Sequence, residues 1–117
     1  MAQGYIGEVR LFASQRVPKG WLPCDGRLMP VAQYQVLFSL IGPLYGGDGF
    51  RTFALPDLRG RSPVGTGEGP GVAPCELAQQ VGNTLVEPAT GGKGVPTPPG
   101  LGLTFMIAYA GDYPVPE

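Results

Sequence analysis

Apolar and polar residues alternate near the start of the chain, where Val9 and Leu11 flank the charged residues Glu8 and Arg10. A period of two residues is typical of a strand with one covered face. We therefore expect a strand over residues 5–12.

One later segment has the period of a helix. Its apolar stripe consists of Tyr34, Leu37, Phe38 and Ile41. These positions are spaced at i, i+3, i+4 and i+7, which places them on one helix face. Pro30 suits a first helical turn, and Gly42 with Pro43 suits a helix end. The pattern predicts a helix over residues 30–41.

The remaining segments before residue 100 are short or irregular. Residues 21–24, 52–55 and 84–86 are expected to be short extended pieces. Residues 60–74 are rich in Gly and Pro and are expected to be irregular, and residues 76–80 are expected to form one helical turn.

The most apolar segment is residues 101–111. One face of the expected strand carries Leu101, Leu103, Phe105, Ile107 and Tyr109. The other face carries Gly102, Thr104, Met106, Ala108 and Ala110. Since neither face is charged, we expect both faces to be covered. Base rates favour an ordinary central strand; the alternative is an assembly strand, in which a neighbouring subunit covers one face.

Composition places these elements in a folded chain. The 117 residues include 20 Gly and 14 Pro, yet 43% of the chain is hydrophobic, which is too much for a disordered segment. We predict a mainly β domain with one short helix, of the α+β class and rich in Gly/Pro loops. Residues 1–117 are expected to form one domain, with a Gly/Pro-rich loop or arm at 87–100.

The charge balance excludes some partners. Only 15% of the residues are charged and the net charge is −1, so no field attracts nucleic acid or an anionic membrane. No apolar run has the length of a membrane span. A low charge weakens repulsion between copies, which suits self-association. The start of the chain shows no signal peptide, although an already processed chain would look the same.

The sequence offers no complete catalytic or cofactor site. It contains no histidine, so Ser–His and Cys–His nucleophiles are not available, and a zinc site is unfavoured. The glycine-rich run at 60–67 lacks the Gly-Lys-Ser/Thr ending of a phosphate loop. Asp25, Asp48 and Asp57 stand beside Gly or Pro, where aspartate usually bonds its own backbone. We expect no enzyme, no cofactor and no metal.

Two sets of residues have structural interpretations. Cys24 and Cys75 are either a disulfide pair or two separate buried thiols, and the sequence leaves both open. Asp57, Arg59 and Arg61 alternate in charge, and arginine suits bidentate pairing with a carboxylate. We interpret these three residues as a structural ion-pair group within or between subunits.

Three long motifs make the chain similar to a known family. The first is Gly7-Glu8-Val9-Arg10-Leu11-Phe12 with Pro18-x-Gly20-Trp21-x-x-Cys24-Asp25-Gly26. The second is Leu37-Phe38-x-x-Ile41-Gly42 with Tyr45-Gly46-Gly47-Asp48-Gly49. The third is Thr52-Phe53-Ala54-Leu55-Pro56-Asp57-Leu58-Arg59-Gly60-Arg61-x-Pro63-x-Gly65. These motifs resemble phage tail-collar domains, whose bacterial members are often called microcystin-dependent proteins. Residues 101–111 resemble the closing strand of the family.

The resemblance implies a structural, self-assembling subunit of a phage-tail-fibre-like or extracellular filament, outside the cell or in a virion tail. Its implied partners are copies of itself, in a homotrimer or filament, and other tail proteins. The alternative is a tail-fibre tip that binds a host receptor or glycan through Trp21, Tyr45, Phe50 and Tyr113. The chain departs from the family at 87–100, a short stretch without histidine, where relatives often carry a longer region. This departure counts against receptor binding.

Overall fold

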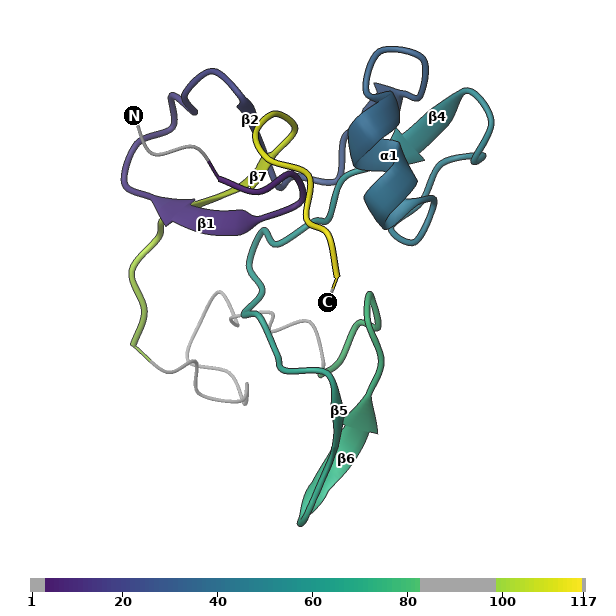
Figure 1. Ribbon diagram of the computed structural model, residues 1–117. Coiled ribbons are helices and arrows are strands. Elements are labelled where there is room, and N and C mark those ends of the chain that lie inside the picture. Colours follow the sequence, from purple (N-terminus) through teal and green to yellow (C-terminus); the bar gives the residue numbers. More distant parts are fainter. Residues whose placement is uncertain (1–3, 83–98, 117) are drawn as a thin grey trace. The chain divides into compact units, whose positions relative to one another are not determined.

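A computed structural model describes residues 4–82 and 99–116. In chain order its elements are β1 (Val9–Phe12), β2 (Trp21–Pro23), β3 (Leu28–Pro30), α1 (Gln35–Ile41), β4 (Thr52–Ala54), β5 (Gly67–Gly69), β6 (Val72–Cys75) and β7 (Thr104–Ala108). Short strands and one short helix confirm the predicted fold class (Figure 1). The chain divides into two compact units, Met1–Val64 with Leu103–Glu117, and Gly65–Gly102.

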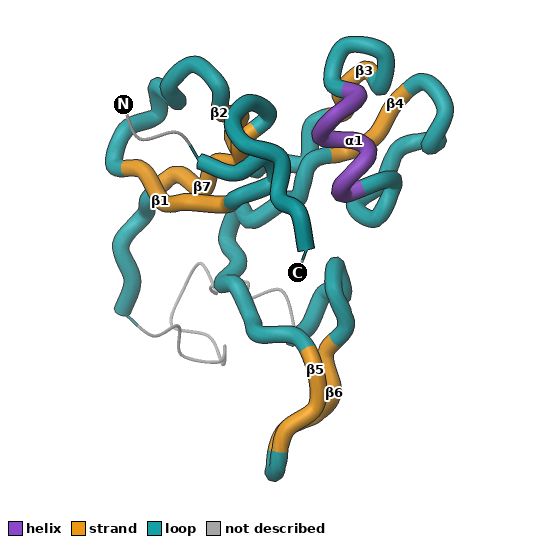
Figure 2. The backbone as a smooth tube through the Cα atoms, in the orientation of Figure 1, coloured by secondary structure: helices purple, strands orange, loops and turns teal. Residues whose placement is uncertain are grey.

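The first unit contains a three-stranded antiparallel sheet in the order β1-β7-β2 (Figure 2). Ile107 in the central strand lies opposite Val9 of β1 on one side and Leu22 of β2 on the other. The C-terminal segment is therefore inserted between two strands from the N-terminal part. Strand β7 is shorter than the 101–111 strand predicted from sequence, because Leu101 to Leu103 precede the pairing.

The helix is also shorter than predicted. Residues 31–34 form turns rather than a first helical segment, and the carbonyl of Pro30 accepts hydrogen bonds from the backbone N–H groups of Gln33 and Tyr34. Pro30 itself ends strand β3, where it lies opposite Thr52 of β4. This long-range pairing with β4 holds Pro30 in an extended conformation, so that the helix starts only at Gln35.

The second unit contains a hairpin that the sequence did not predict. Strands β5 and β6 pair antiparallel across Pro70 and Gly71, and Gly71 has a φ of +77°, which suits a glycine in a tight turn. The expectation of irregular structure throughout 60–74 was therefore wrong for β5 and β6. The backbone N–H of Gln79 donates to the Glu76 carbonyl across a turn in which Ala78 has a φ of +69°, so the helical turn expected at 76–80 does not form. The strand expected at 84–86 and most of the arm expected at 87–100 lie outside the described residues.

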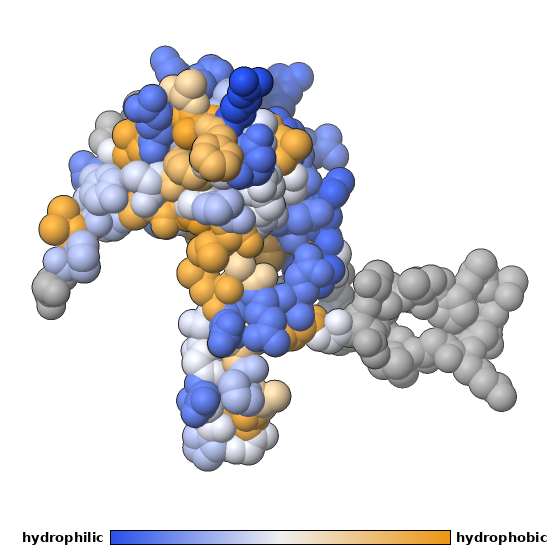
Figure 3. Space-filling model, turned by 90° about the vertical axis from the view of Figure 1, so that its right-hand side faces the viewer, coloured by the Kyte–Doolittle hydropathy of each residue, from blue (hydrophilic) through white to orange (hydrophobic). Residues whose placement is uncertain are grey.

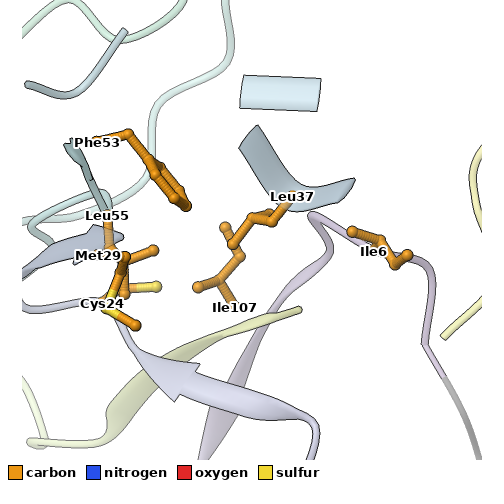
Figure 4. Packing of buried hydrophobic residues seen from close by; sticks show 7 residues of the cluster. All are labelled: Ile6, Cys24, Met29, Leu37, Phe53, Leu55 and Ile107. Atoms are coloured by element: carbon orange, nitrogen blue, oxygen red, sulfur yellow. The ribbon is translucent and has the colours of Figure 1, made fainter. Parts of the chain in front are cut away.

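The core of the first unit joins its elements. The largest fully buried side chains are Phe53, Leu37, Leu55 and Ile107. Leu37 from the helix and Ile107 from the sheet meet in this cluster with Ile6, Cys24 and Met29 (Figure 4). Burying one such aliphatic side chain contributes about 1.5–3 kcal/mol. The predicted helical stripe therefore does face the core, where Leu37 packs in the same cluster as Ile107 of the sheet.

Candidate assembly surfaces and charged turns

The predicted assembly residues do not share one environment. Ile107 is buried in the core, and Phe105 and Tyr109 are partly buried against it. Leu101 and Leu103 are exposed, at 85% and 43% of their surface. Met106 and Ala108, on the opposite face, are also buried. The centre of β7 is thus covered on both faces within its own unit, and the exposed apolar surface belongs to other residues.

Apolar side chains that reach solvent are numerous in the described part of the chain (Figure 3). Those in the first unit include Val9 and Leu11 on β1, Val36 on α1, and Leu44 and Phe50 in loops. On the other face of β1, Glu8 binds the side chain of Arg10, whose guanidinium lies 5.3 Å from the ring centre of Trp21. The charged side chains Glu8 and Arg10 therefore lie on one face of the sheet, and the apolar side chains Val9 and Leu11 lie on the other.

Two aspartates from separate loops meet in an isolated antiparallel bridge, Asp25 opposite Asp57. Each aspartate accepts hydrogen bonds from the backbone and side chain of the arginine two residues later. Asp25 holds Arg27, and Asp57 holds Arg59, each with a closest guanidinium contact of 2.8 Å. The two turns are joined by backbone bonds from Leu58 to the Cys24 carbonyl and from Gly26 to the Pro56 carbonyl.

The electrostatics of this pair of turns follow from the same contacts. Hydrogen bonds from Arg59 lower the pKa of Asp57 to about 2, and Arg61 adds a smaller effect of the same sign. Hydrogen bonds from Arg27 likewise lower the pKa of Asp25, and the charge of Arg59 contributes as well. Both carboxyl groups are therefore ionised at neutral pH and held in ion pairs, which leaves neither as a proton donor.

The structure thus brings Asp57 and Arg59 together, whereas no ion pair of the described residues includes Arg61. Sequence analysis missed the partner turn of Asp25 and Arg27. A signal was present, because Asp-x-Arg occurs at both 25–27 and 57–59. The spacing alone did not indicate that the two turns pair.

Asp48 organises the glycine-rich loop before β4. Its Oδ1 atom accepts hydrogen bonds from the backbone N–H groups of Phe50, Arg51 and Thr52, at 2.8, 2.8 and 3.0 Å. These bonds lower the pKa of the Asp48 carboxyl. The loop is therefore fixed by three exposed backbone bonds to one side-chain oxygen, and Phe50 beside it is 87% exposed.

These turns and loops lie within the part of the chain that matches a family model. Residues 7–63 match the family model described as Phage Tail Collar Domain. The resemblance seen in the sequence is confirmed. The collar segment contains both Asp-x-Arg turns, the Asp48 loop, strands β1 to β4 and helix α1.

A curated protein is similar over much of the same length. The chain is 37% identical over 59 residues to a protein of Rhizobium leguminosarum bv. viciae named Protein RhiB. The aligned part covers 48% of this chain and 27% of RhiB. The chain therefore spans about a quarter of the length of this curated relative.

The candidate contact aromatics have different surroundings. Trp21 and Tyr45 are partly buried in the collar segment, and burial raises the pKa of the Tyr45 hydroxyl. Phe50, in the same segment, is almost fully exposed, and Tyr113, beyond it, is about half exposed. Of these four aromatic residues, only Phe50 and Tyr113 have about half or more of their surface exposed to solvent.

Cys24 and Cys75 are free thiols in the structure, and both are buried. Cys24 belongs to the collar segment and Cys75 to the second unit. Burial raises the pKa of the Cys24 thiol to about 12, with a smaller contribution from the charge of Asp25. A thiol with this pKa is hardly ionised near neutral pH and is a poor nucleophile.

No group of three or more His, Cys, Asp or Glu side chains in the described part of the chain could hold a metal ion. No described helix is long and apolar enough to cross a membrane.

Proposed function

We propose that the chain is a structural subunit of a phage-tail-fibre-like or extracellular filament assembly, joined by contacts between copies, with no enzymatic activity of its own. The observation that carries the proposal is the collar match over residues 7–63. Copies of the chain are its first partners, in a homotrimer or a filament, and other tail proteins are further partners. The site of action is the virion tail or the outside of the cell.

The chemistry of the described residues supports this proposal. The charged side chains best placed for acid–base work, Asp25 and Asp57, are held in ion pairs with arginine. Meanwhile several large apolar side chains of the first unit lie in solvent, although single exposed apolar residues are normal on any protein. An assembly would cover part of this apolar surface and would be stabilised by its burial.

Sedimentation of the purified chain over a wide concentration range, together with negative-stain electron microscopy, tests the proposal. We expect a discrete oligomer or filaments, with a mass that rises with concentration before it reaches a plateau. A monodisperse monomer at the highest concentration would overturn it. Adding salt separates charge-driven from apolar association, since only the former weakens strongly.

Phe50 favours a second candidate function, the binding of a host surface glycan or receptor. Its side chain is exposed next to a loop whose backbone Asp48 holds through hydrogen bonds. A backbone fixed in advance loses little entropy on binding. Glycan-array binding that Phe50→Ser abolishes and Leu44→Ser leaves intact would support this function. Unchanged binding in both variants, or no binding by the original chain, would count against it.

A further inference from the structure

The outer edge of β1 has hydrogen-bonding groups without a partner strand in the described sheet. Ala108 donates to the Glu8 carbonyl, and Gly7 donates to the Ala108 carbonyl. Bonded positions recur every second residue along an antiparallel pair. Within the regular register of Val9–Phe12, Arg10 and Phe12 therefore bond to β7, whereas the N–H and C=O groups of Val9 and Leu11 point away from the sheet. Gly7 lies before this register, and its N–H is already used inside the sheet.

The opposite edge of the same sheet is blocked. Cys24 donates to the Phe105 carbonyl and Tyr109 donates to the Gly20 carbonyl, so Leu22 is the residue of β2 that bonds to β7. Trp21 and Pro23 then form the outer edge of β2. Proline has no N–H to offer a neighbouring strand, and natural sheets use it to prevent edge pairing. Among the described residues of this sheet, it is the β1 edge that offers outward N–H and C=O groups at two successive bonded positions, Val9 and Leu11.

The side chains at the β1 edge have a self-complementary order. Val9 and Leu11 lie on the core face of the sheet and remain 42% and 53% exposed. Glu8 and Arg10 lie together on the other face, next to Trp21. An apolar pair on one face and one charge of each sign on the other are features that a second copy of the same strand can match.

We propose that β1 is a contact between two copies of this chain, in which two β1 strands pair antiparallel about a two-fold axis at Val9. The proposal rests on the function proposed above and names one surface of its filament form, because a two-fold contact does not occur within a homotrimer. Val9 of each copy lies opposite Val9 of the other and exchanges backbone hydrogen bonds with it. Glu8 of each copy lies opposite Arg10 of the other, so opposite charges meet twice across the axis.

The charges decide between this alignment and its two neighbours. An axis at Arg10 would place the two Arg10 side chains directly opposite each other, which is destabilising. An axis at Leu11 would place Arg10 opposite Phe12 and remove Glu8 from the contact. Because a two-fold contact uses the same patch on both copies, it closes after two chains, and any longer assembly requires another surface.

Cysteine cross-linking tests the alignment. Directly opposite residues in a bonded antiparallel pair have Cα atoms about 5.5 Å apart, which a disulfide can span. We expect Val9→Cys to form a covalent dimer on mild oxidation and Leu11→Cys to form almost none, with the unmodified chain as the control for Cys24 and Cys75. Cross-linking of Leu11→Cys alone, or of neither variant, would overturn the alignment about Val9.

A charge substitution tests the contact without relying on disulfide geometry. Val9→Lys places two positive charges opposite each other, and we expect it to weaken self-association by about tenfold or more. Val72→Lys in the second unit is the matched control, because Val72 is 65% exposed and does not belong to the apolar surface of the first unit. Circular dichroism and thermal melting of both variants check that the fold is kept. Equal association of the original chain and Val9→Lys would overturn the proposal.

The two proposals fail differently. If the original chain is monomeric at every concentration, the structural function fails and the edge contact fails with it. If the original chain associates while the Val9 variants behave like their controls, only the β1 contact fails, and another surface joins the copies.

Discussion

Asp25 and Asp57 lie opposite each other in an antiparallel bridge, and each carboxylate holds the arginine two residues further along the chain. Like charges directly opposite across strands are destabilising. Here each carboxylate is neutralised by its own arginine, so the two loops can approach. The arrangement connects the end of β2 with the segment after β4, and both belong to the collar segment.

The first prediction concerns the acid sensitivity of this bridge. The folded pKa of Asp57 is about 2, below the usual value of 3.8, so its contribution to stability is present above pH 4 and is lost as the pH falls from about 4 to 2. Because the pair is largely exposed, we expect Asp57→Asn to lower the melting temperature at pH 7 by only about 1–3 °C.

The pH profile separates this effect from a general change. The original chain and Asp57→Asn should converge in melting temperature as the pH falls towards 2, because the original carboxylate then becomes protonated. The control is Asp112→Asn, which removes a carboxylate outside the Asp25–Asp57 bridge. The difference in melting temperature between Asp112→Asn and the original chain should stay the same over this pH range. A constant difference between the original chain and Asp57→Asn down to pH 2 would contradict the assignment.

The second prediction concerns the close approach of the Gly47 loop to β4. A Cβ atom at Gly47 would lie 2.5 Å from the Cα atom of Phe53, and the residue has a φ of +89°. We expect Gly47→Ala to destabilise the fold by roughly 3 kcal/mol or more, from left-handed strain and overpacking together. Gly60→Ala is the control, since Gly60 also has a positive φ but has open space around it.

Chemical denaturation measures both glycine variants. Gly60→Ala should lose only about 1–2 kcal/mol, the cost of the backbone conformation alone. Equal losses at the two positions would show that the contact with Phe53 adds nothing, and that the family's Gly-Gly-Asp-Gly run is needed for its backbone angles only.

Periodicity predicted the parts of the fold that depend on local patterns. The apolar stripe identified the helix face that carries Leu37, and alternation identified β1. Sequence could not place Pro30 in a strand, because that assignment depends on pairing with Thr52 far along the chain. The β5–β6 hairpin was missed because its strands contain Gly67, Gly69 and Pro74, and glycine and proline are depleted in strands generally.

The candidate site was also predicted only in part, because its motifs are local while the pairing of its loops is not. The motifs around Asp25, Asp48 and Asp57 were visible and indicated the family. The pairing of Asp25 with Asp57 was not, because two loops meet only once the core has formed. The unpaired β1 edge was also hidden in the sequence, since it depends on which strand occupies the middle of the sheet.

The third prediction separates the internal role of β7 from a role in assembly. Ile107 is 1% exposed, and we expect Ile107→Ala to destabilise the fold by about 2–5 kcal/mol. Leu101→Ala removes a side chain of similar size from an exposed position before the strand, so it should change the stability of the isolated chain by no more than about 0.5 kcal/mol. Urea denaturation at a concentration where the chain is dissociated gives both values.

The same two variants can then be compared for assembly. If the apolar end of the chain joins subunits through its exposed residues, Leu101→Ala should reduce oligomer mass while its folding stability stays unchanged. If Leu101→Ala lowers stability as much as Ile107→Ala does, the segment before β7 packs inside its own chain, and the assembly role of Leu101 and Leu103 would be excluded.

The fourth prediction distinguishes the two states left open for the cysteines. The structure contains Cys24 and Cys75 as buried free thiols, and the Cys24 thiol has a pKa of about 12. We expect the native chain, kept without reductant, to take up iodoacetamide slowly at Cys24 even at pH 9, because little thiolate forms below its pKa. After unfolding in denaturant, still without reductant, mass spectrometry should find two labels per chain. A mass with no label, and with two labels only after reduction, would show that the cysteines form a disulfide and that the thiol state does not represent the protein as isolated.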